Sequence, residues 1–397
     1  MADSAVRLLA YAFFAIALVF AAVAWVLDDV FFFRLATEAL IFGGLALSVD
    51  LLLGRTGLLP LGQALFFGFG AYVSALVLKH MAPSLPLALA VVLLSSTLVG
   101  LLGGVIAIRA KGVYFALISF GLAQVVSKVV FNTRELGASD GLIGVPAPVW
   151  LGLNTAHAPS FFLLVLLGMA ALLAFLMWLM NTPFGRQLDA IRTNEHRLPF
   201  LGFDPWRYKL AVFVLAAQVA ALSGALYPML RGFVSPELMF FQVSGNAVIN
   251  VIVGGTGTLV GALYGSALLT VLKSVVGSFT AHHAIVIGAL FVVSVIFFPK
   301  GLVGYLVPAL QRWPSACSAS EQVAAGRRSV ANWQRCAMTK PSRCSAAVLP
   351  SATFPRSRPP SATFVWWRPA GSRSTRLSTW PCRFCWASSW PSPRCGW

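Results

Sequence analysis

The 397-residue chain has little charge, because only 10% of its residues are Asp, Glu, Lys or Arg, against about 25% in soluble globular proteins. Hydrophobic residues make up 58% of the chain, and the mean hydropathy is +0.82. These values exclude an ordinary soluble enzyme and indicate an integral membrane protein.

Cysteine is absent from residues 1–311, which excludes a disulfide framework or a thiolate metal site in this body. All six Cys and eight of the twelve Trp lie in residues 312–397. The body has 16 Lys and Arg against 11 Asp and Glu, whereas the tail has 13 Lys and Arg against one acid, Glu321. The net charge of +17 therefore belongs mostly to the tail and does not indicate nucleic-acid binding.

Residues 312–397 form a low-complexity basic tail without hydrophobic periodicity, and Ser-Ala-Thr-Phe occurs in it at both 351–354 and 361–364. Disordered segments have few aromatic residues, so this tail matches neither a folded nor a usual disordered class. We interpret it as the product of a frameshift and expect no packed structure. The alternative is a genuine basic tail at the membrane surface.

The body is predicted to be an all-α bundle of about ten membrane-spanning helices, since a span needs about 20 apolar residues. The first apolar segment is longer than the core of a signal peptide, so we expect it to be retained. The apolar segments are 6–27, 34–54, 57–78, 85–108, 113–131, 161–180, 210–230, 240–255, 258–277 and 283–299.

Lys and Arg in short loops predict the orientation of the bundle. Five basic residues lie in loop 181–209, and the turn 109–111 reads Arg-Ala-Lys. With an even number of spans, these loops are cytoplasmic together with Arg7, Arg55 and Lys300, and both ends of the body are cytoplasmic. The basic residues that this assignment places on the opposite side are Arg34, Lys79, Arg134, Arg231 and Lys273.

Loop 182–209 has the pattern of a short amphipathic helix over 186–202. Leu188, Ile191 and Leu198 are spaced along one helical face, and Leu201 continues it. The charged residues on the other faces are three positions apart, which predicts local pairing of Asp189 with Arg192 and of Arg192 with Glu195. Such a helix is either a passive surface element or a lever that contacts a cytoplasmic partner.

Two glycine-rich stretches share the pattern G-x-T-G-x-L, at 54–59 and at 254–259. Glycine allows helices to approach closely in a membrane, and it breaks helices where freed backbone groups line a cavity. The shared pattern suggests corresponding positions in two halves of the bundle. The residues predicted to serve helix breaks or close packing are Gly54, Thr56, Gly57, Gly254, Gly255, Thr256 and Gly257.

Polar residues inside the spans are few and costly, so they face protein or water. Gln63, Asn246 and Asn250 lie beside the glycine-rich stretches and are candidates to line a translocation pathway. Hydrogen bonding between helices is the alternative. Glu38 and Asp50 lie near opposite ends of the second segment, where they are expected to reach the interface.

Motifs for covalent chemistry are missing from the body: it contains neither GxxxxGK[ST] nor HExxH nor a CxxC pair. We therefore predict a protein that is not an enzyme and holds no metal or cofactor of its own. Loop 132–160 is rich in turn-forming residues and is either a solvated connector or a docking face for an extracytoplasmic partner.

Several motifs, in order along residues 1–310, resemble the permease subunits of branched-chain amino acid ABC importers, the LivM-like group. They are GLALSVDLLLGRTGLLPLGQALFFGFGAY, RAKGVYFALISFGLAQVV, GASDGLIGVP, TPFGRQLDAIRTNEHRLPFLGFDPWRYKLAVFVLAA, GALYPMLRGFVSPELM, VIVGGTGTLVGALYGSALL and FFPKGLVG. Two departures are Arg197-Leu198-Pro199, where the family has a helix richer in Ala and acids, and Gln63, where it often has His.

The resemblance implies a subunit of the bacterial inner membrane that imports Leu, Ile or Val together with a second permease, as a heterodimer. Two cytoplasmic ATPase subunits would bind and hydrolyse the ATP, and a periplasmic binding protein would deliver the amino acid. A permease for urea, amides or other amino acids is one alternative, and a secondary transporter that works alone is another.

The resemblance also implies that loop 182–209 couples the permease to the ATPases. Leu188 and Ile191 would supply the apolar contact, and Gly185 and Gly202 would bound the helix. The residues expected to carry this coupling are Gly185, Arg186, Leu188, Asp189, Ile191, Arg192, Glu195 and Gly202.

Overall fold

The structure is a computed structural model, and all its described residues fall within one compact unit, Met1–Arg327. The described residues are 2–26, 29–81, 84–146, 148–150, 153–154, 157–279, 288 and 301–304. Apart from residue 288, the predicted segment 283–299 lies outside them, and so does the tail 312–397.

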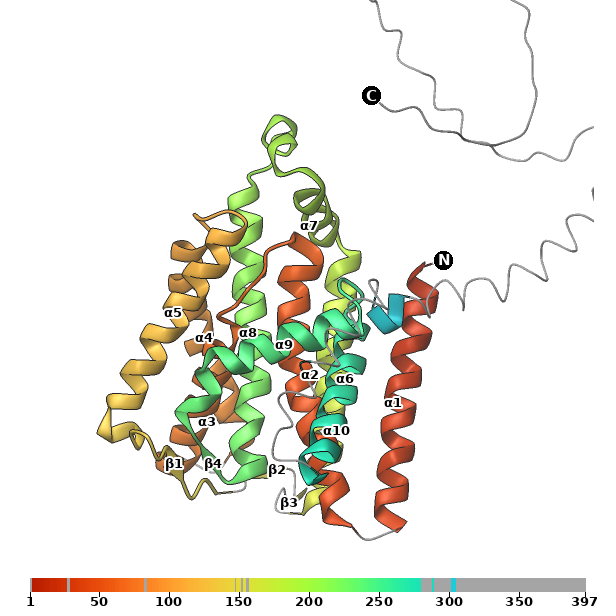
Figure 1. The fold of residues 1–397 in the computed structure, drawn as a ribbon, viewed down its shortest axis with the longest axis vertical. Helices are drawn as coiled ribbons and strands as arrows, with labels where there is room; N and C mark the ends of the chain where they lie inside the picture. The colour runs from red at the N-terminus through yellow and green to blue at the C-terminus, as the bar shows by residue number, and fades with distance from the viewer. Residues whose placement is uncertain are drawn as a thin grey trace, which may run out of the picture. The chain divides into compact units, whose positions relative to one another are not determined.

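The described chain is built mainly from α-helices (Figure 1). They are α1 (Ala2–Val26), α2 (Val30–Thr56), α3 (Gln63–His80), α4 (Leu85–Ala107), α5 (Val113–Asn132), α6 (Ala158–Asn181), α7 (Pro183–Asn194), α8 (Pro205–Arg231), α9 (Phe241–Gly254) and α10 (Val260–Phe279). Short 3-10 turns follow some of them: η1 (Arg134–Leu136), η2 (Glu195–Arg197), η3 (Pro199–Leu201) and η4 (Pro236–Met239).

Seven of these helices are long and apolar enough to cross a membrane, which confirms the predicted all-α bundle of membrane spans. They are α1, α2, α4, α5, α6, α8 and α10. Two predicted spans are shorter as helices. The segment 57–78 becomes helical only at Gln63, and the 14 residues of α9 extend about 21 Å, less than the roughly 30 Å of a hydrocarbon core.

Helix α8 is the centre of the bundle and packs against α2, α3 and α4. Small residues bring the backbones of α3 and α8 into contact: a Cβ on Gly70 would lie 2.2 Å from the Ala221 carbonyl oxygen, and a Cβ on Gly224 would lie 1.9 Å from that of Phe67. This is the close approach that small residues allow between membrane helices. The centre of the bundle is thus fixed by backbone contact.

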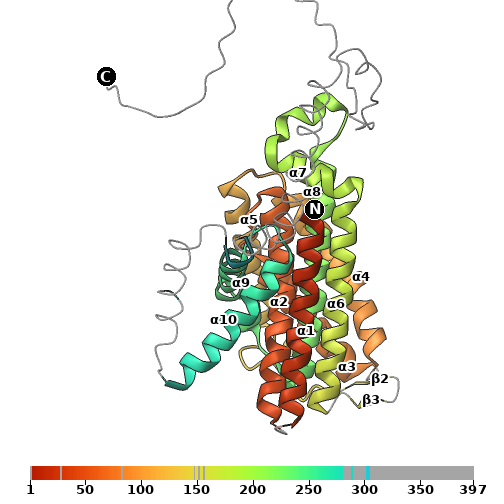
Figure 2. The same ribbon diagram turned by 90° about the vertical axis from the view of Figure 1, so that its right-hand side faces the viewer.

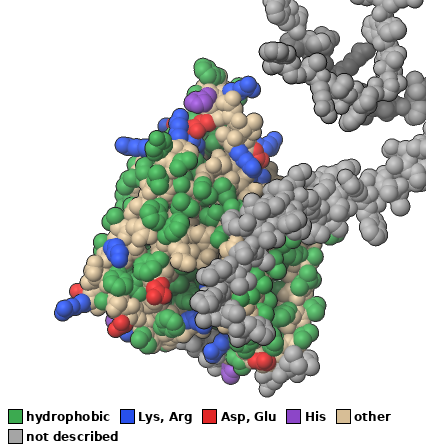
Figure 3. Space-filling view, viewed as in Figure 1, with side chains coloured by type: hydrophobic (Ala, Val, Ile, Leu, Met, Phe, Trp, Pro, Cys, Tyr) green, Lys and Arg blue, Asp and Glu red, His purple; other side chains and the backbone are tan. Residues whose placement is uncertain are grey.

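Apolar side chains cover the outside of the bundle between its two ends (Figure 3). Helices α4, α5 and α6 expose large ones, among them Leu94, Val125 and Leu167. Lys and Arg lie toward both ends of the bundle, including the end that carries α7 (Figure 3). This distribution is that of a multi-pass membrane protein.

The loops that carry most of the predicted cytoplasmic charge lie at one end of the bundle. Figure 1 places α7, the start of α1, the end of α2 and the α4–α5 turn together there. Figure 2 shows α1, α2 and α6 side by side, with α10 inclined away from them.

Loop 132–160, at the opposite end, is attached to the α8–α9 connection. Strand β1 (Leu142–Ile143) pairs antiparallel with β4 (Phe233–Val234), and β2 (Val149–Trp150) pairs with β3 (Leu153–Asn154). The Lys79 ammonium donates to the Ile143 carbonyl at 3.4 Å. The described part of this loop is therefore tied to the bundle, and its role as a docking face stays a prediction.

Candidate functional site

Helix α7 lies against α2, α6 and α8 and presents its apolar face to them. Leu188 and Ile191 are buried, and a Cβ on Gly185 would lie 2.1 Å from the Met180 carbonyl oxygen, so only glycine fits there. The expectation that Leu188 and Ile191 contact a partner is therefore wrong. Their burial instead fixes α7 to the bundle, while Arg186, Asp189 and Arg192 are exposed.

The predicted helix over 186–202 is broken into shorter pieces. α7 ends at Asn194, and the 3-10 turns η2 and η3 follow, with Gly202 in the left-handed conformation (φ 80°) at the end of η3. The Glu195 carboxylate lies 2.7 Å from the Lys209 ammonium, whose side chain is only 5% exposed. This ion pair anchors the loop to the first turns of α8.

Four large apolar side chains lie on the outer surface of this loop and form a patch that the sequence analysis missed. Phe200 is 91% exposed and Leu201 is 72% exposed, and Phe203 and Trp206 are also exposed. We call these four residues the loop patch. Leu201 was expected to continue the buried face of Leu188; it points outward because the helix ends before it.

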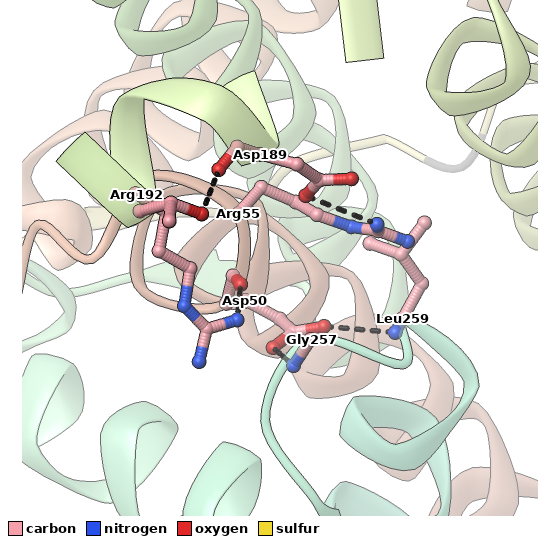
Figure 4. Close-up of polar contacts among 8 residues, drawn as sticks. Asp50, Arg55, Asp189, Arg192, Gly257 and Leu259 are labelled. Atoms are coloured by element: carbon pink, nitrogen blue, oxygen red, sulfur yellow. Dashed lines mark hydrogen bonds and ion pairs between the residues drawn. The ribbon is translucent and has the colours of Figure 1, made fainter. Parts of the chain in front are cut away.

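Polar contacts join α7 to the last turn of α2 (Figure 4). The Arg55 guanidinium lies 3.5 Å from the Asp189 carboxylate, and the Arg192 guanidinium donates to the Gly54 carbonyl. The predicted local pairs of Asp189 with Arg192 and of Arg192 with Glu195 are therefore wrong. Each of these charges finds a partner on another element, because the folded chain brings α2 and α8 beside α7.

Asp50 connects α2 to the loop between α9 and α10 (Figure 4). Its side chain is fully buried, and its two oxygens accept hydrogen bonds from the backbone N–H of Gly257 at 2.6 Å and of Leu259 at 2.8 Å. Both N–H groups belong to the loop that precedes α10, and backbone N–H groups of this kind need an acceptor when they are away from water. The expectation that Asp50 reaches the membrane interface is therefore wrong.

The two glycine-rich stretches are in contact with one another. A Cβ on Gly54 would lie 2.5 Å from both the Gly257 nitrogen and the Asp50 carboxylate, so glycine is required at that position. A Cβ on Gly254 would lie 1.9 Å from the Gly261 carbonyl oxygen. Both positions therefore lie in close contact with neighbouring backbone.

The remaining positions of the two stretches serve in different ways. Gly57 is the left-handed C-cap of α2, and the buried Thr56 hydroxyl donates to the Leu52 carbonyl. Gly255 is buried against Gly301, whereas Thr256 is exposed.

The three pathway candidates do not lie together. Asn246 and Asn250 line a cavity of about 110 Å³ between α2, α9 and α10, together with Glu38 and Lys273. Gln63 is absent from that lining; it is fully buried at the start of α3, and neither atom of its amide has a hydrogen-bond partner in the described structure. A buried amide of this kind needs a water or another ligand as a partner.

These contacts form a continuous physical connection through the described bundle. It runs from α7 through Arg192 and Asp189 to the end of α2, and from Asp50 to the loop that joins α9 and α10. Within the described residues no three His, Cys, Asp or Glu side chains gather as a metal site.

Comparison with known proteins identifies the family. A family model described as "Branched-chain amino acid transport system / permease component" matches residues 31–295. The high-affinity branched-chain amino acid transport system permease protein LivM of Salmonella typhimurium is 29% identical over 301 residues, which cover 70% of this chain and 71% of that protein. LivM of Escherichia coli matches with the same identity and coverage.

Relatives with other named solutes also match. The autoinducer 2 import system permease protein LsrC of Photorhabdus laumondii is 26% identical, covering 61% of this chain and 74% of that protein. The ribose import permease protein RbsC of Haemophilus influenzae is 25% identical, covering 57% and 68%. No solved structure matches the chain significantly. The chain belongs to the family of permease components of branched-chain amino acid transport systems, and within it the chain is a LivM-like permease.

Proposed function

We propose that this LivM-like permease is the transmembrane subunit of an ATP-binding cassette importer for Leu, Ile and Val. The named function of the LivM relatives supports the substrate, and the contacts that link α7 through α2 to the α9–α10 loop support the mechanism. The permease carries no catalytic centre of its own in this proposal. ATP is bound and hydrolysed by two cytoplasmic partner subunits.

The end that carries α7 is placed in the cytoplasm of a bacterium, and the bundle spans its inner membrane. Both ends of the permease body are then cytoplasmic, and the loop 132–160 faces the periplasm. A periplasmic binding protein docks on that side, and a second permease subunit completes a heterodimer. The gathering of basic loops at the α7 end supports this orientation.

The ATPase subunits contact the loop patch rather than the buried face of α7. Phe200 and Leu201 are among the most exposed large apolar side chains of the described chain, and an aromatic anchor of this kind typically carries much of the energy of an interface. The buried Leu188 and the Glu195–Lys209 ion pair make the loop a rigid extension of α7 and α8. Movement of the ATPase then reaches Arg55 and Gly54 through α7.

The test is a double substitution in the loop patch, Phe200→Ser with Leu201→Ser, in the complete importer. We expect loss of ATPase co-purification by at least about 10-fold, because each truncated anchor removes about 1–3 kcal/mol of apolar burial. The matched control is Phe233→Ser, which changes an exposed Phe at the opposite end of the bundle.

Uptake of radiolabelled leucine into proteoliposomes is measured in parallel. If the double variant bound the ATPase subunits and took up leucine at wild-type levels, the loop patch would not be the coupling surface. Failure of the wild-type importer to accumulate leucine, with all partner subunits present, would refute the proposed substrate.

A further inference from the structure

The cavity between α2, α9 and α10 carries opposite charges on facing helices. Glu38 of α2 and Lys273 of α10 both line it, together with Asn246 and Asn250 of α9. A second hollow shares Glu38 and Lys273 in its lining. Charged side chains within the membrane-spanning part of a protein are energetically costly. A cavity lined by charges of both signs therefore indicates a functional site.

The Glu38 carboxylate is held in place but not saturated. One of its oxygens lies 2.7 Å from the Arg231 guanidinium, and the side chain is 23% exposed. Within the described residues, its other oxygen has no ion-pair partner, and neither has the Lys273 ammonium. The cavity therefore offers one carboxylate oxygen and one ammonium to a ligand.

The rest of the lining is apolar or amide. Phe42 of α2 and Leu269 of α10 provide aliphatic and aromatic surface, while Asn250 is buried without a side-chain hydrogen bond to any described residue. The cavity has a volume of about 110 Å³, which gives room for several waters or for one small solute. A sugar has no charges for Glu38 and Lys273 to pair with, so this chemistry favours a zwitterion with an apolar side chain.

We infer that this cavity is a transient binding site for the transported amino acid, an inference that rests on the proposed function. Lys273 pairs with the α-carboxylate, and the free oxygen of Glu38 accepts from the α-ammonium. Asn246 and Asn250 donate to the carboxylate, and the branched side chain lies against Phe42 and Leu269. Each charge of the zwitterion thus meets its complement.

The position of the cavity relates it to the contacts of α7. Its α9 and α10 walls meet at the loop 255–259, which Asp50 holds by two hydrogen bonds. A change in that loop alters the angle between α9 and α10, and therefore the width of the site. Release of the amino acid is in this way tied to the movement of α7.

The experiment uses the complete importer in proteoliposomes with a diazirine analogue of leucine delivered by the binding protein. We expect photolabel on peptides of α9 or α10, and we expect excess leucine to compete it. Lys273→Met should reduce both this labelling and the leucine moved per ATP by at least about 10-fold, and Lys273→Arg should restore most of each. Glu38→Gln should reduce the labelling similarly.

The matched control is Lys128→Met, which removes an exposed lysine of α5 that does not line the cavity. It should leave labelling and uptake within about 2-fold of wild type. The inference fails if the wild-type importer accumulates leucine while the label is absent from α9 and α10, or is not competed by leucine. It also fails if Lys273→Met and Glu38→Gln label and transport like wild type. A wild-type importer that accumulates no leucine refutes the proposed function instead.

Discussion

The two glycine-rich stretches share one letter pattern but obtain their backbone conformations differently. In 54–59 the helix ends through its own backbone: the Gly57 N–H bonds the Leu52 and Leu53 carbonyls, as in a common C-terminal cap. In 254–259 the backbone turns through Gly255, Gly257 and Leu259, all at positive φ. In the second stretch Asp50 of another helix accepts two of the N–H groups, in addition to hydrogen bonds within the turn itself.

The difference gives the stretches unequal roles in the bundle. The first is self-sufficient and offers its Gly54 carbonyl to Arg192 of α7. The second depends on a residue two hundred positions earlier in the chain, so it responds to whatever moves α2. The proposed connection from α7 to the α9–α10 cavity relies on this difference between the two stretches.

The largest effect is expected for Asp50→Ala, which tests whether the second glycine-rich stretch needs the Asp50 carboxylate. It leaves two buried N–H groups unpaired, each at a cost of about 1–3 kcal/mol, so the free energy of unfolding should fall by about 2–6 kcal/mol. Asp50→Asn keeps one acceptor oxygen and should lose about half as much. Thermal unfolding in detergent measures the loss of stability in both variants, and leucine uptake measures whether transport is affected.

The control for Asp50 is Asp140→Ala, because Asp140 is exposed in the loop at the opposite end. We expect its free energy of unfolding to change by less than about 0.5 kcal/mol. Equal stability of Asp50→Ala and wild type would show that the second stretch does not need the carboxylate.

A smaller effect is expected from Gly254→Ala, which tests the close contact inside the second stretch. The added Cβ would lie 1.9 Å from the Gly261 carbonyl oxygen, and backbone must move to admit it. Overpacking of this kind lowers the free energy of unfolding by about 3 kcal/mol. Circular dichroism melting of the purified permease measures it.

Gly245→Ala is the matched control, since Gly245 lies on the same helix with no atom within 4 Å of an added Cβ. Because alanine favours a helix over glycine, this variant should gain up to about 1 kcal/mol. If both variants lost stability alike, the loss would come from α9 itself and not from its contact with α10.

The sequence predicted the long helices well because hydropathy is a local property. The segments 34–54 and 161–180 lie inside α2 and α6, within a few residues of their ends. Interruptions were harder: Pro60 and the glycines around it delay α3 to Gln63, and the apolar segment 240–255 contains only a short helix. An apolar segment indicates that residues lie within the membrane, but it does not indicate where a helix begins and ends.

The sequence predicted which residues belong to the candidate site better than it predicted which residues contact one another. Gly54, Gly254, Asn246 and Asn250 all lie where close packing or a cavity requires them. Charge pairing failed, because spacing reports only neighbours on the same helix, whereas Asp189 pairs with Arg55 across 134 positions. Asp50 carried one signal that could have identified it, an acid within an apolar segment, which is costly unless it is paired.

The smallest effect is expected for a substitution at Gly57, which tests the first glycine-rich stretch. Its φ of 74° lies in the left-handed region, yet an added Cβ would meet only the Arg192 Cγ, at 3.8 Å. Gly57→Ala therefore has backbone strain but no clash, and should lower the free energy of unfolding by about 1–2 kcal/mol. Gly57→Asn should lose less, because asparagine adopts this conformation more readily than other residues that carry a side chain.

Leucine uptake by Gly57→Ala should stay within about 2-fold of wild type, since the Gly54 carbonyl and Asp50 keep their partners and Gly57 itself is exposed. The decisive measurement is the pair of melting curves for Gly57→Ala and Gly254→Ala, recorded under one condition. A cap that closes through its own backbone tolerates the substitution, whereas a turn pressed against a neighbouring backbone does not. Equal losses in the two variants would mean that both stretches are held by their surroundings, and the first would then also have to move with α7.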